Sequence, residues 1–104
     1  MKLSYPAIFY HWDEPGSTGY TVEVPDLPGC VSEGDNLTQA IIMGTNAASG
    51  WVLSELEDGN PVPEASDVAD IHPEQGGFVS MLLLDMDVYA EKYGHKAVLE
   101  ETVF

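Results

Sequence analysis

The sequence contains no arginine and only three lysines, Lys2, Lys92 and Lys96, against 18 acidic residues. Its 104 residues therefore carry a formal net charge of -15 at pH 7. Proteins that bind nucleic acids draw most of their affinity from lysine and arginine contacts to phosphates. We expect this chain to be repelled by DNA, RNA and anionic membranes, whereas its field attracts a basic protein partner. Acidity that only keeps the chain soluble is the alternative explanation.

Cysteine and long apolar runs are also scarce. Cys30 is the single cysteine, so an internal disulfide is excluded and a reducing compartment is compatible. The longest apolar run, residues 78–84, is far too short to cross a membrane, and residues 1–4 lack the apolar core of a signal peptide. We therefore expect one cytoplasmic domain with no membrane association, in which Cys30 is a buried structural thiol rather than a nucleophile.

Three short strands are predicted in the first third of the chain. Residues 3–11 are rich in aromatic and β-branched side chains, and residues 20–24 alternate between apolar and polar. The turn-forming cluster of residues 13–19 separates them and predicts a hairpin. A second break at residues 25–29 precedes a short strand at residues 30–34.

One long helix follows. Asn36, with Gln39 three residues later, fits a capping box, and Gly59 is placed for a C-cap. The predicted buried stripe steps by three and four residues and is interrupted only by Glu55; its members are Leu37, Ala40, Ile41, Gly44, Ala47, Ala48, Trp51, Val52, Glu55 and Leu56. The small residues in the middle of this stripe predict close packing against a sheet.

The last third of the sequence predicts a loop, a strand, a short helical turn and a tail. Residues 61–77 are rich in proline and glycine. Residues 78–85 form a strand that is apolar at almost every position, which predicts a central position in the sheet or cover on both faces. A short helical turn at residues 87–94 and a strand-like tail at residues 97–104 follow. The fold class is therefore α+β: a small antiparallel sheet with one long helix packed on one face.

Acidic residues raise the alternative of a metal-dependent nuclease. The carboxylates that would hold the metal are Asp13, Glu23, Asp26, Asp85 and Asp87. The chain has no cationic cluster to hold a nucleic-acid substrate, and its histidines lack metal-ligand spacing, so we predict no catalytic residue, no metal and no cofactor. Turn and helix capping by these aspartates is the structural explanation.

Trp12 lies between the first strand and Asp13 and Glu14, in a hairpin that we predict to be exposed. Aromatic side chains flanked by acids suit an interface with a basic partner, where tryptophan and tyrosine are frequent hot spots. Partial packing of Trp12 over the sheet is an equally good explanation.

Several motifs, in order and with matching gaps, resemble the N-terminal domain of the HicB antitoxin family. The central one is Pro25-Asp26-Leu27-Pro28-Gly29-Cys30, which lies between two short strands and is followed by Gly34-Asp35 and an alanine-containing helix. The helix exit, residues 58–66, and the segments at residues 78–79, 84–89 and 92–98 also match the family pattern.

The resemblance implies a partial ribonuclease-H-like β-β-β-α-β fold without catalytic apparatus. It implies a partner of the HicA type, a small basic toxin that cleaves mRNA, whose active site the antitoxin covers. Many family members add a C-terminal DNA-binding part and repress their own operon as dimers or tetramers. Here Glu100 and Glu101 lie where a DNA-reading ribbon would need neutral or basic residues, which argues against DNA binding by this 104-residue chain.

We therefore predict an antitoxin, not an enzyme, that neutralises a HicA-type toxin and forms a homodimer or homotetramer. Residues 1–95 are the predicted antitoxin domain, and residues 96–104 are a tail that begins a DNA-binding or dimerisation segment. The predicted toxin contacts are Trp12, Asp13, Glu14, Glu23 and Asp26, and the predicted oligomer contacts in the tail are Val98, Leu99, Val103 and Phe104. The nuclease above and an orphan oligomeric regulatory domain are the alternatives.

Overall fold

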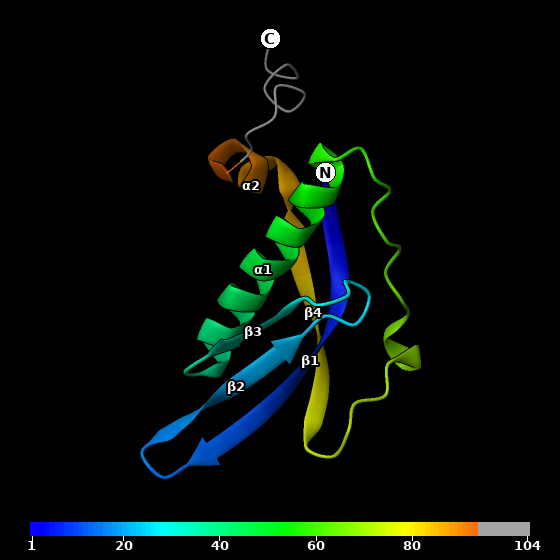
Figure 1. Ribbon diagram of the computed structural model, residues 1–104. Helices are drawn as coiled ribbons and strands as arrows, with labels where there is room; N and C mark the ends of the chain where they lie inside the picture. The colour runs from blue at the N-terminus through cyan, green and yellow to red at the C-terminus, as the bar shows by residue number, and fades with distance from the viewer. Residues whose placement is uncertain (94–104) are drawn as a thin grey trace.

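The computed structural model describes residues 1–93, which form a four-stranded antiparallel sheet covered on one face by a long helix (Figure 1). The elements follow in the order β1 (Lys2–Glu14), β2 (Ser17–Glu23), β3 (Val31–Gly34), α1 (Leu37–Glu57), a 3-10 turn η1 (Val68–Asp70), β4 (Gly77–Asp85) and α2 (Met86–Tyr93). The predicted α+β class and the β-β-β-α-β order are thereby confirmed.

The strand order in the sheet is β3-β2-β1-β4, so β1 lies inside the sheet and β3 and β4 form its edges. The β1–β2 hairpin is tighter than predicted. Asp13 pairs with Thr18 and Glu14 with Ser17, which leaves only residues 15–16 as the turn. Gly16 adopts a positive φ of 82° there, a conformation that favours glycine.

The core lies between α1 and the face of the sheet that α1 covers, called here the inner face. Alternate β1 residues point inward and are buried, with Tyr5 at 1% and Phe9 at 0% exposure. The remaining buried members come from the other strands and from α1; they include Val22, Leu82, Leu84, Ala40, Ala48 and Val52. Burial of these apolar side chains is the main stabilising contribution to the fold.

Both ends of α1 form as predicted. The side chain of Asn36 accepts a hydrogen bond of 2.8 Å from the backbone N–H of Gln39, and Gly59 follows the C-cap with a φ of 76°. A Cβ added at Gly44 would lie only 3.1 Å from Val22 Cγ1, so α1 approaches the sheet closely through its small residues. The prediction that Leu37 and Ile41 are buried is wrong: both are exposed, because small residues form the narrow contact and larger ones flank it.

The prediction that β4 is central or covered on both faces is also wrong. β4 is an edge strand, and its burial alternates, with Leu82 and Leu84 buried and Met81 and Leu83 exposed. A strand that is apolar at almost every position carries no clear period-two signal, so its sequence could not distinguish the covered face from the open one.

The predicted helical turn is α2, which lies beside the C-terminal end of α1 (Figure 1). The hydroxyl of Tyr89 lies 3.0 Å from the position that a Cβ on Gly50 would occupy. The backbone N–H of Met86 donates to the carbonyl of Met1 at 2.9 Å, which ties α2 to the start of β1. The predicted strand-like tail, including Val98, Leu99, Val103 and Phe104, lies outside the described residues.

Candidate functional site

The turn between β2 and β3 contains the Pro-Asp-Leu-Pro-Gly-Cys motif and is closed by its own backbone. Val24 N–H donates to the Cys30 carbonyl at 3.0 Å, and Leu27 N–H donates to the Val24 carbonyl at 3.0 Å. Cys30 N–H donates to the Leu27 carbonyl at 2.9 Å. Leu27 is fully buried, and Gly29 takes a positive φ of 82°. The motif is therefore a compact, internally bonded turn whose centre is anchored in the core.

Two contacts anchor this turn to other parts of the chain. The Asp26 carboxylate accepts hydrogen bonds from the backbone N–H of Ser66 at 2.8 Å and from the Ser66 hydroxyl at 2.6 Å. The indole N–H of Trp51 in α1 donates to the Pro28 carbonyl at 3.0 Å. Trp51 is thus a half-buried anchor rather than only a core residue. The turn links the sheet, α1 and the segment between α1 and β4, residues 58–76, called here the 58–76 connection.

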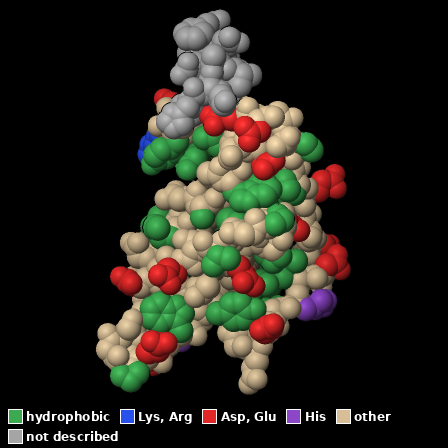
Figure 2. All heavy atoms as spheres, in the orientation of Figure 1, with side chains coloured by type: hydrophobic (Ala, Val, Ile, Leu, Met, Phe, Trp, Pro, Cys, Tyr) green, Lys and Arg blue, Asp and Glu red, His purple; other side chains and the backbone are tan. Residues whose placement is uncertain are grey.

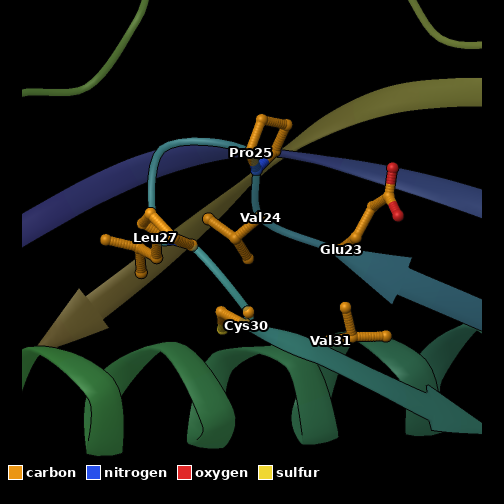
Figure 3. A pocket seen from close by; sticks show the side chains of 8 residues that line it. Glu23, Val24, Pro25, Leu27, Cys30 and Val31 are labelled. Atoms are coloured by element: carbon orange, nitrogen blue, oxygen red, sulfur yellow. The ribbon is translucent and has the colours of Figure 1, made fainter.

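The same turn lines a small depression of about 240 Å³ (Figure 3). Figure 3 shows Leu27 and Cys30 directed toward the α1 side, whereas the Glu23 carboxylate points away from the turn. Burial raises the pKa of the Cys30 thiol, so the thiol stays protonated at neutral pH and is a poor nucleophile. The structure thereby confirms the prediction of a buried thiol.

Tyr5 lies near this turn. Its hydroxyl donates a 2.6 Å hydrogen bond to the Pro63 carbonyl. Burial, and secondarily the negative charge of Asp26, raises the pKa of Tyr5. The neutral phenol therefore remains a donor at physiological pH and holds the connection against β1.

The five predicted toxin contacts do not form one cluster. Trp12, Asp13 and Glu14 lie at the end of β1 in the hairpin, but strand alternation places Trp12 on the outer face, opposite to α1, and Asp13 on the inner side. A Cβ added at Gly19 would meet the Trp12 indole at 2.6 Å, so this ring is half-buried over the hairpin.

The other two predicted contacts lie elsewhere. Glu23 is opposite Ile8 on the outer face, four positions from Trp12 along β1, which is about 13 Å in a strand. Asp26 is partly buried, and both of its carboxylate oxygens bind Ser66. Among residues 1–93, no group of three or more histidine, cysteine, aspartate or glutamate residues could hold a metal ion. No helix within this part of the chain is long and apolar enough to span a membrane.

The structure also shows an exposed apolar surface that was not predicted from the sequence. Large apolar side chains are exposed on the first two turns of α1; we call them the α1 patch, and its members are Leu37, Ile41, Ile42 and Met43. Figure 2 shows hydrophobic side chains in several separate patches on the face that it draws, with carboxylates around and among them. A signal existed in the sequence: α1 carries no charged residue from Leu37 to Ser54.

The chain is similar to known proteins at the level of sequence and of structure. A protein of 14.9 kDa encoded in the rep-hol intergenic region of Haemophilus phage HP1 is 34% identical over 77 residues, which is 72% of this chain and 57% of that relative. The chain thus spans little more than half the length of the relative. The fold matches a toxin-antitoxin complex chain from Streptococcus pneumoniae with a TM-score of 0.75 and 24% identity, over 92% of this chain and 79% of that one.

The antitoxin HicB of Burkholderia pseudomallei matches with a TM-score of 0.70 and 26% identity, over 96% of this chain and 81% of that chain. The family model described as "HicB_like antitoxin of bacterial toxin-antitoxin system" matches residues 5–98. This range contains the anchored turn, α1, β4 and α2. The chain therefore belongs to the family of HicB-like antitoxins of bacterial toxin-antitoxin systems.

Proposed function

We propose that this chain neutralises a small basic mRNA-cleaving toxin of the HicA type by binding it, rather than by catalysis of its own. The observation that carries the proposal is the HicB-like antitoxin match over residues 5–98. The predicted antitoxin domain of residues 1–95 covers almost the same range, and we propose that it is the toxin-binding unit.

Charge supports this proposal. A ribonuclease that binds RNA must present cations to phosphates, and a chain with a net charge of -15 and no arginine is electrostatically complementary to such a surface. An acidic inhibitor competes with RNA for the same cations. We propose that the protein acts in the cytoplasm, where mRNA is the toxin's substrate.

The test is an RNA-cleavage assay with the small basic protein encoded beside this chain. We expect the neighbouring basic protein to cleave mRNA on its own. We expect cleavage to stop when about one equivalent of this chain is added. The control is this chain after heat unfolding, which keeps the charge of -15 but loses the folded surface.

Two outcomes would contradict the proposal. Cleavage that continues at several equivalents of the folded chain would show that it is not an inhibitor. Cleavage of RNA by this chain alone, dependent on added Mg²⁺, would instead support the metal-dependent nuclease.

A further inference from the structure

The α1 patch is an exposed apolar surface on a helix that is otherwise well packed. The side chains of Leu37, Ile41, Ile42 and Met43 are between 37% and 47% exposed. They occupy the N-terminal half of α1, whereas Ala40, Gly44 and Ala48 make the contact with the sheet. The patch is therefore not required to close the core.

The solvent side of α1 is unusual in its charge. A helix that packs one face on a sheet normally carries charged residues on the opposite face. The chain is 20% charged, yet α1 has no charged residue between Leu37 and Ser54. Depletion of charge together with exposed apolar side chains is typical of the centre of a protein–protein interface.

Aromatic residues on the inner face adjoin the first turn of α1. Gly34 lies beneath this turn, since a Cβ there would be 2.3 Å from Ala40 N, and Gly34 pairs with Tyr20. The Tyr20 ring in turn lies 4.9 Å from the His11 ring and 6.3 Å from the Phe78 ring, measured between centroids. His11, Tyr20 and Phe78, here called the aromatic trio, lie on the inner face of the sheet, where Gly34 connects Tyr20 to the start of α1.

Carboxylates lie at the margin of this combined surface. Asp35 precedes α1 and is exposed, and Asp13 is exposed on the same face of the sheet as His11 and Tyr20. We infer that the α1 patch and the aromatic trio form the docking surface for the basic toxin, with Asp13 and Asp35 facing its cations. An apolar centre with a charged rim is the usual arrangement of such an interface. This inference rests on the proposed function.

The outer face of the sheet is the competing surface; its exposed apolar residues are Met81 and Leu83, neighbours on that face of β4, and Val31 on the opposite edge. Val31 belongs to β3 and Leu83 to β4, which are the two opposite edges of the sheet. Three strand spacings, about 14 Å, separate them. Glu23 and Thr21 lie on the same face of β2, between Val31 and the exposed β4 residues Met81 and Leu83.

The experiment compares variants that place the same residue on the two faces. Ile42→Glu alters the α1 patch, and Leu83→Glu alters the outer face at a residue that is 68% exposed. Met43→Gln is a second, uncharged variant that keeps side-chain length and does not rely on I42E folding. Binding to the neighbouring basic protein is measured by titration calorimetry, RNA cleavage is measured in parallel, and far-UV circular dichroism reports folding.

We expect I42E and M43Q to raise the Kd about tenfold or more, while L83E leaves it within about threefold. The inference is overturned if L83E is the damaging variant while the α1 variants inhibit like the parent; the proposed function then stands. It is also overturned if light scattering shows the parent to be a dimer that I42E dissociates without affecting toxin binding, because the patch would then join two copies of this chain. If the parent itself fails to inhibit, the proposed function has failed.

Discussion

Single polar contacts join parts of this chain that are distant in sequence. The clearest is between Asp26 in the β2–β3 turn and Ser66 in the 58–76 connection, 40 residues apart, where one carboxylate accepts from both a backbone N–H and a hydroxyl. Hydrogen bonds to charged groups are stronger than those between neutral ones. Asp26 therefore acts as an internal anchor in the free protein, in addition to any role toward a partner.

Ser66→Ala should destabilise the fold. The substitution removes the 2.6 Å hydrogen bond to the Asp26 carboxylate and keeps the backbone bond, so we expect the free energy of unfolding to fall by about 1–2 kcal/mol. Urea denaturation followed by tryptophan fluorescence measures it. Ser80→Ala, at an exposed position on β4, is the control and should change stability by less than about 0.5 kcal/mol. Equal losses in the two variants would show that the anchor contributes nothing specific.

At the scale of elements, α1 is the part of the fold that its own sequence specifies best. Each signal in α1 acts on its own part of the helix: Asn36 predicts the start, the small residues predict the packed face, and Gly59 predicts the end. The close packing of α1 on the sheet depends on two glycines. Gly44 packs over Val22, and Gly34 lies beneath the Ala40 backbone. A backbone neighbour cannot move aside as a side chain can, so Gly34 is the more restrictive of the two.

The cap of α1 provides a prediction at this scale. Asn36→Ala removes the acceptor of the Gln39 N–H, so we expect about 1 kcal/mol of destabilisation and a melting temperature lower by roughly 4–8 °C. Differential scanning calorimetry measures it. Asn46→Ala is the same substitution at an exposed position inside α1, where alanine is the better helix former, and should leave the melting temperature unchanged or raise it. A fall of similar size in N46A would refute the capping explanation.

Other elements show why part of the site escaped prediction. The apolar run of β4 predicts a strand, but it does not predict a position at the edge of the sheet. That position follows from the pairing of β4 with β1 alone, which depends on the arrangement of the whole sheet. The burial of Leu37 and Ile41 was expected from helical spacing, which gives a direction around the helix but not the width of its contact. The Asp26–Ser66 contact has no local pattern at all, so only the folded chain reveals it.

At the scale of the whole molecule, charge is the dominant property. A net charge of -15 creates a long-range negative field, to which Asp35 contributes just before α1 and Asp13 contributes on the same face of the sheet as the aromatic trio. Such a field speeds encounter with a cationic partner more than it strengthens the final complex. Apolar contacts at the patch would then govern how long the complex lasts, while the carboxylates govern how quickly it forms.

This division predicts that the association rate constant depends strongly on salt and that the dissociation rate constant does not. Raising ionic strength from 0.01 M to 1 M shortens the Debye length from about 30 Å to about 3 Å, so the association rate constant with the basic partner should fall about tenfold or more in stopped-flow measurements, while the dissociation rate constant changes little. The double variant Asp13→Asn with Asp35→Asn should associate more slowly than the parent at low salt. Glu64→Gln with Asp70→Asn removes the same charge from exposed positions in the 58–76 connection and should have a smaller effect. If both double variants slow association equally, net charge alone steers the encounter, and the carboxylates beside α1 have no special part in it.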